Sequence, residues 1–233
     1  MTSMTQIHLI GGEKGGVGKS MVSRVLAQYF IDHSIAFTGF DADRSHGALL
    51  RFYANYASAV LVDQYESLDA IVEAATSQPE RRILVDLAAQ TSEPLMRWMD
   101  ESQLLSVAAE LNLHIRYWHV MDAGRDSVEM LRQLFDRYQS RLNYVVVHNQ
   151  LRGSDFRIFD ESGLAERAQT YNAPVIAIPR LHERTMLKID AASSSFWAAT
   201  QDDDRTSGLA LLERQRVKSW LQAAYAAISV VAP

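Results

Sequence analysis

A glycine-rich segment near the N-terminus carries the residues best suited to chemistry. From Gly11 to Ser20 it reads GGEKGGVGKS, and it follows directly on the apolar run Ile7–Ile10. Glycines allow successive backbone N–H groups to turn toward an anion without a Cβ in the way. The segment therefore predicts a phosphate-binding loop between a strand and a helix. We expect Lys19 to contact the β- and γ-phosphates of a nucleotide and Ser20 to place its hydroxyl on Mg²⁺.

The segment departs from the strict pattern GxxxxGK[ST], because Glu13 stands where the first glycine belongs. A second lysine, Lys14, lies five residues before Lys19. The alternative is a flexible glycine turn with a surface lysine, but the strand before it and the helix after it favour the phosphate-binding loop. The other residues expected to contact the nucleotide here are Gly15, Gly16, Val17, Gly18 and Met21.

Acidic residues end two further apolar runs. Phe40-Asp41-Ala42-Asp43 ends the second predicted strand, and Asp86 ends the run Arg82–Val85. Ligands gather at the carboxyl ends of parallel strands, so these carboxylates are candidates for the same site as the loop. The alternative for two aspartates at a strand end is capping of the loop that follows.

In this setting, KGGVGKS resembles the deviant Walker A loop of the ParA/MinD class of P-loop ATPases. The resemblance implies an ATP-dependent homodimer in which Lys14 reaches the nucleotide bound by the other subunit. It also implies that Asp43 orients the attacking water and couples to Mg²⁺. Asp86, similar to a Walker B aspartate, would hold Mg²⁺ through water.

The same resemblance points to two residues near the adenine. Asn149 ends the run Tyr144–His148 with an amide, which can donate and accept at once. Pro179 follows the run Val175–Ile178 and is similar to the family's Ile-Pro turn. A turn-forming role is the alternative for Asn149. Within the class, the chain looks most like plasmid mobilisation and conjugation ATPases of the MobD and TraL type.

The wider pattern alternates short apolar runs with longer amphipathic segments. Strands that are apolar on both faces are typical of a buried parallel sheet, and β and α segments in alternation favour a doubly wound α/β fold. We expect one domain over residues 1–233. The predicted strands are Ile7–Ile10, Ala36–Phe40, Ala59–Val62, Arg82–Val85, His114–Val120, Tyr144–His148 and Val175–Ile178. The predicted helices are Ser20–His33, Ser67–Thr76, Glu93–Glu110, Arg125–Ser140, Glu161–Tyr171, Glu183–Ala191 and Gly208–Ile228.

Composition excludes several kinds of site. The 233 residues include no cysteine, which rules out disulfides, thiolate metal sites and a cysteine nucleophile. The net charge of −5 does not favour a strongly basic nucleic-acid binder, although Arg180, Arg184 and Lys188 could form a basic stripe for nonspecific DNA binding. No secretory signal or membrane span is apparent, so we expect a cytoplasmic protein. The last helix could be a membrane anchor, but packing on the sheet is the favoured reading.

These observations predict a magnesium-dependent ATPase that acts as a molecular switch. It would dimerise on ATP and position a cargo such as plasmid DNA or a conjugation apparatus, with a protein activator or cargo adaptor as partner. One alternative is an ATP-dependent small-molecule enzyme similar to dethiobiotin synthetase or cobyrinate amidase. Another is a regulatory module that binds ATP without hydrolysing it, against which Asp43 and Asp86 argue.

Overall fold

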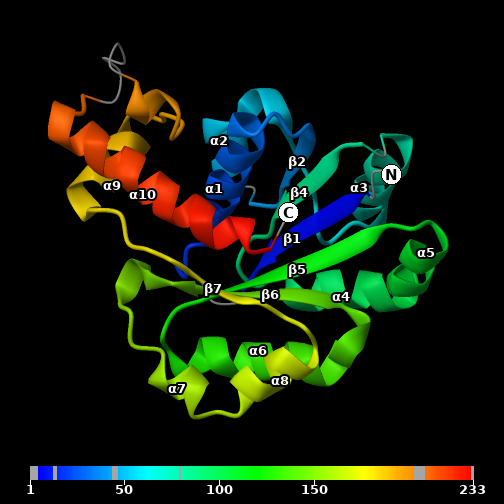
Figure 1. Ribbon diagram of the computed structural model, residues 1–233. Helices are drawn as coiled ribbons and strands as arrows, with labels where there is room; N and C mark the ends of the chain where they lie inside the picture. Colours follow the sequence, from blue (N-terminus) through cyan, green and yellow to red (C-terminus); the bar gives the residue numbers. More distant parts are fainter. Residues whose placement is uncertain (1–4, 13–14, 44–46, 79, 202–207, 232–233) are drawn as a thin grey trace.

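Seven parallel strands form one twisted sheet at the centre of the protein (Figure 1). The computed structural model describes residues 5–12, 15–43, 47–78, 80–201 and 208–231. The strand order is β3-β2-β4-β1-β5-β6-β7, which confirms the doubly wound α/β fold. The strands are β1 (Gln6–Gly11), β2 (Phe37–Asp41), β3 (Ala57–Ala59), β4 (Arg82–Asp86), β5 (His114–Met121), β6 (Asn143–Asn149) and β7 (Val175–Ile178).

Helices cover both faces of the sheet and create two hydrophobic cores. One face packs against α1 (Lys19–Asp32), α2 (Ala48–Phe52), α9 (Glu183–Ala191) and α10 (Leu211–Ser229). The other packs against α3 (Tyr65–Ser77), α4 (Ser92–Glu101), α5 (Leu104–Glu110), α6 (Arg125–Tyr138), α7 (Arg157–Asp160) and α8 (Leu164–Thr170). Short 3₁₀ turns lie at Ala54–Tyr56, Gln139–Arg141, Gln150–Arg152 and Ala198–Thr200.

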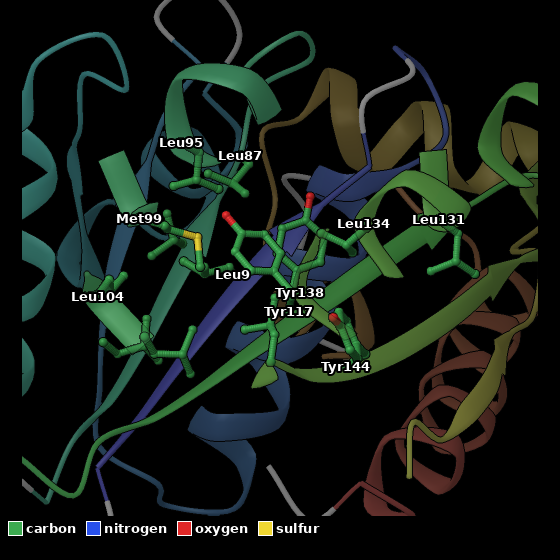
Figure 2. Close-up of a cluster of buried hydrophobic side chains, with 14 of the residues drawn as sticks. Leu9, Leu87, Leu95, Met99, Leu104, Tyr117, Leu131, Leu134, Tyr138 and Tyr144 are labelled. Atoms are coloured by element: carbon green, nitrogen blue, oxygen red, sulfur yellow. The ribbon is translucent and has the colours of Figure 1, made fainter. Parts of the chain in front are cut away.

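The second core fills the space between the sheet and α4 to α6 (Figure 2). Figure 2 shows Leu9 and Tyr117 from the sheet beside Leu87, Leu95 and Tyr138. Apolar burial of this kind contributes about 25 cal/mol per Å² and fixes the order of the strands. That order brings the carboxyl ends of β1, β2 and β4 together at one edge.

The structure corrects four of the expected element bounds. The third strand is Ala57–Ala59 rather than Ala59–Val62, because β3 pairs with Gly39–Asp41 of β2. The predicted helix Glu93–Glu110 is broken into α4 and α5, since Gln103 adopts a left-handed conformation at φ 48°. The helix expected from Glu161 begins only at Leu164, after Gly163 at φ 76°. The last helix begins at Leu211 rather than at Gly208. No pattern in the sequence predicts the five-residue helix α2.

The last helix packs on the body of the protein. Val217, Leu221, Ala224 and Ile228 on one face of α10 are buried, and the neighbouring Trp220 is buried with them. This burial agrees with the packed reading of the helix, because a membrane anchor would leave that face exposed. In the part of the chain that the structure describes, no helix has the length and apolar character that crossing a bilayer requires.

Candidate nucleotide-binding site

The glycine-rich segment forms the expected turn between β1 and α1. Gly16 and Gly18 have φ values of 75° and 94°, a left-handed conformation that glycine adopts without strain. Gly18 is the residue before the first turn of α1, and Lys19 begins the helix. The backbone amides of residues 15–18 donate to no backbone carbonyl among the described residues. Backbone amides of a glycine-rich turn at a helix N-terminus are suited to an anion. Lys14 and Glu13 lie outside the described residues.

Asn149 at the end of β6 braces this loop. Its Nδ2 donates a hydrogen bond of 2.7 Å to the carbonyl of Val17. Its amide also lies directly against Gly18, so that a Cβ at Gly18 would clash with Nδ2. Its Oδ1 accepts from the backbone N–H of Leu151 at 3.3 Å. The amide is thus turned toward the loop, and its contact with an adenine stays a prediction.

Two buried aspartates lie side by side at the carboxyl edge of the sheet. Asp41 of β2 and Asp86 of β4 are register partners, and each is 1% exposed. Asp41 accepts three backbone hydrogen bonds, from Asp43 at 3.0 Å, Leu49 at 2.8 Å and Leu50 at 3.2 Å. Asp41 therefore caps α2 and fixes the backbone at Asp43, which lies two residues beyond the strand.

Asp86 has a different environment. Neither carboxylate oxygen has a hydrogen-bond partner among the described residues. Burial, and secondly the neighbouring Asp41, raise the pKa of Asp86 to about 7. The hydroxyls of Ser23 and Ser20 and the ammonium of Lys19 act in the opposite direction, but neither hydroxyl reaches hydrogen-bond geometry with the carboxylate. A buried carboxylate beside Ser20 and Lys19, without a hydrogen bond among the described residues, fits a hydrated cation.

This arrangement suits Mg²⁺ better than a metal held wholly by side chains. No group of three or more histidine, aspartate or glutamate side chains in the described ranges could hold a metal ion. Mg²⁺ keeps several waters and binds through one or two carboxylates together with phosphate oxygens. Ser20, Asp43 and Asp86 are the residues that would hold it here.

A cavity of about 510 Å³ adjoins the loop on the side of α1, α2 and α9. Ser20 and Met21 line one part of it, together with Leu151, Arg180 and Leu181. The structure thus brings Met21 close to Leu151, two residues after Asn149, and to Arg180, the residue after Pro179. The Pro179 carbonyl accepts a hydrogen bond of 2.7 Å from Nε1 of Trp220, which fixes the turn after β7.

Sequence reasoning missed the arginine of α1 that lines this cavity. Arg24 lies four residues after Ser20 and so shares its helix face, which is a signal that could have been used. The guanidinium is packed over the ring of Phe52 at 3.6 Å and forms an ion pair of 2.7 Å with Asp190. Burial lowers its pKa from the usual value, while Asp190 opposes that change.

Comparison with solved structures shows the same fold in bacterial MinD. The MinD cell division protein of Aquifex aeolicus superposes with a TM-score of 0.53 over 92% of this chain and 97% of that one, at 12% identity. A chain of the MinC:MinD cell division protein complex of the same organism gives a TM-score of 0.54 over 94% of this chain and 96% of that one, also at 12% identity. No family model matches the sequence.

Sequence comparison finds relatives among the MobD and TraL proteins. MobD of Acidithiobacillus ferrooxidans is 25% identical over 182 residues, which are 76% of this chain and 79% of that protein. A TraL protein of Escherichia coli is 25% identical over 229 residues, 92% of this chain and 93% of its own. The chain resembles the ParA/MinD type of P-loop ATPase. The glycine-rich loop, the neighbouring carboxylates of Asp41 and Asp86 and the adjoining cavity thus form one candidate site.

Proposed function

We propose that the protein is a magnesium-dependent ATPase that works as a molecular switch. The observation that carries this proposal is the left-handed glycine turn that leads into α1, together with the buried carboxylate of Asp86, whose oxygens have no hydrogen-bond partner among the described residues. The amides and Lys19 would bind the phosphates of ATP. Ser20 and Asp86 would hold Mg²⁺, which neutralises charge on the phosphates when bound. Asp43, fixed through its backbone N–H to Asp41, would orient the water for hydrolysis.

We further propose that ATP joins two copies of the chain in the cytoplasm. Lys14 of one subunit would contact the nucleotide of the other. Two triphosphates that face each other bring many negative charges together, and each triphosphate needs a cation to offset its charge. The dimer would position plasmid DNA or a conjugation apparatus with the help of a protein activator or cargo adaptor. Similarity to MobD and TraL, and the complex that MinD forms with MinC, support partners of this kind. Nonspecific contact with DNA is compatible with this function, and a membrane is the less favoured surface.

Calorimetry and light scattering test this proposal together. With Mg²⁺ and ATP, the wild-type chain should release heat and shift from monomer to dimer. Lys19→Ala should abolish binding, whereas Lys14→Ala should bind ATP and remain monomeric. Lys218→Ala, a change at an exposed lysine of α10, serves as the matched control and should behave as wild type. A nucleotide-bound wild-type chain that stays monomeric would contradict the switch.

A second candidate function is an ATP-dependent small-molecule enzyme. The observation that favours it is a cavity of about 290 Å³ between α4, β5 and α6, lined by polar groups that include Glu93, His119 and Arg137. Such a cavity could hold a small substrate. Turnover that is stimulated by a small carboxylic acid, with monomeric protein and no partner, would favour this function over the switch. A third reading, binding without hydrolysis, predicts that turnover does not differ between the wild type and Asp43→Ala.

A further inference from the structure

Arg152 lies against the phosphate-binding loop from the end of a distant strand. It belongs to the short turn Gln150–Arg152 that follows β6, and the bond from Leu151 N–H to Asn149 fixes that turn. A Cβ built on Gly16 would meet Nη2 of Arg152 at 2.5 Å. The guanidinium therefore lies over the loop at Gly16. The next residue, Val17, is the one whose carbonyl Asn149 bonds.

Asp122 is the acidic residue that lies nearest to this guanidinium among the ion pairs of the described residues. It follows β5, and its Oδ1 accepts from Gly124 N–H at 3.0 Å and from the Ser127 hydroxyl at 2.7 Å. These bonds orient the carboxylate so that Oδ2 lies 3.8 Å from Nη1 of Arg152. The Arg152 side chain is still 55% exposed, and among the described residues it makes this ion pair and no hydrogen bond. Among the described residues, no acceptor takes a hydrogen bond from its N–H groups, which lie against the loop.

We propose that Arg152 is a phosphate-contacting residue that supplies its own subunit's site with a second cation. This inference rests on the proposed nucleotide binding. A planar guanidinium can donate two parallel hydrogen bonds to phosphate oxygens, which an ammonium such as that of Lys19 cannot do. Because the guanidinium already lies against the loop, it needs little rearrangement to reach a bound phosphate.

The geometry also distinguishes Arg152 from other arginines of the same segment. Arg157 lies five residues further on, but it forms a bidentate pair with Asp155, in which Nε donates to Oδ1 at 2.9 Å and Nη2 to Oδ2 at 2.6 Å, and its side chain is exposed. Its donors are directed at its own turn, not at the loop. It therefore provides a matched control, an arginine of the same segment without a place in the site.

Binding isotherms with three probes test the role of Arg152. Mg·ATP, Mg·ADP and adenosine are titrated into the full chain as wild type, Arg152→Ala, Arg152→Lys and Arg157→Ala. Arg152→Ala should weaken Mg·ATP binding about tenfold or more, as expected for loss of a charge-assisted bond, and should weaken Mg·ADP binding less. Adenosine affinity should not change. Arg152→Lys should retain part of the affinity, and Arg157→Ala should match the wild type.

The outcomes separate this inference from the function on which it rests. If the wild type binds no Mg·ATP, the proposed function fails and the role of Arg152 fails with it. If the wild type binds but Arg152→Ala binds equally well, only the role of Arg152 is overturned. An equal loss for adenosine would also overturn it, because the residue would then act on the base or on folding. Thermal melting without nucleotide identifies a folding defect, and Arg152→Gln replaces the alanine variant if one appears.

Discussion

Asp41 and Asp86 are neighbours in the sheet, but their carboxylates differ in hydrogen bonding and therefore in role. Three backbone N–H groups bond to Asp41, so its carboxylate stabilises the start of α2 and the position of Asp43. Asp86 has no such bonds and lies beside another carboxylate, which makes its ionised form costly in the absence of a cation. An acidic residue left in this state stabilises the protein only when a positive charge is bound.

Replacement of Asp86 by asparagine should therefore stabilise the nucleotide-free protein. At pH 8 we expect the free energy of unfolding to rise by about 1–2 kcal/mol, because an uncompensated buried charge is removed with little change in shape. The stabilisation that Mg·ATP gives the wild type should disappear. Urea unfolding with and without Mg·ATP measures both effects, and Glu110→Gln, at the exposed end of α5, is the control. A destabilised Asp86→Asn protein without ligand would contradict this account.

At the scale of elements, the end of β6 and the loop after β1 behave as one unit. Asn149 joins them by a hydrogen bond that spans 132 residues of sequence. Asn149→Ala should lower the free energy of unfolding by about 1–2 kcal/mol, since it leaves the buried Val17 carbonyl without a donor. Asn149→Asp should be worse still, because a carboxylate would then face that carbonyl. Equal stability of the two variants and the wild type in urea unfolding would show that the brace contributes nothing.

The C-terminal helix fixes the turn after β7 through one side chain. Trp220 donates to the Pro179 carbonyl and packs edge-on against Phe196, with ring centres 5.0 Å apart. Trp220→Phe keeps the aromatic contact but loses the bond. We expect a loss of about 1 kcal/mol in unfolding free energy. We also expect weaker adenosine binding, because Arg180 and Leu181 of this turn line the cavity of about 510 Å³ beside the loop, where the adenine is predicted to bind. Unchanged adenosine affinity in a destabilised variant would separate α10 from the site.

At the scale of the whole molecule, buried histidines couple folding to pH. Burial lowers the pKa of His119 and of His148 to about 4, and that of His8 well below its usual range. In the unfolded chain these rings titrate near 6.5, so between pH 6.5 and 4 the unfolded state binds more protons than the folded state. Stability should therefore be lost as the pH falls through this window.

His148→Phe tests that dependence at one ring. The imidazole stacks on Phe156 with ring centres 4.0 Å apart, and its Nε2 has no hydrogen-bond partner among the described residues, so a phenyl ring suits the place. Between pH 7 and pH 5 we expect the variant to lose about 1 kcal/mol less stability than the wild type, a value reduced for the partial exposure of the ring. Urea unfolding at several pH values measures the difference, and parallel curves for the two proteins would contradict it.

The sequence by itself determined the strand, the glycine turn and the helix of the candidate site, because these depend on local rules for apolar runs and left-handed backbone. It also determined the parallel α/β fold, since buried strands alternating with helices admit few other arrangements. The placement of Lys14 across a dimer and the extent of the domain stay predictions. Tertiary structure alone decided that Asp41 caps α2, that Gln103 breaks a predicted helix, and that Asn149 and Arg152 lie on the loop. Asn149 and Arg152 are far from the loop in the chain, and only the packed order of the strands brings them within reach of it. The cap by Asp41 and the break at Gln103 are local in the chain, but they depend on how the neighbouring elements pack.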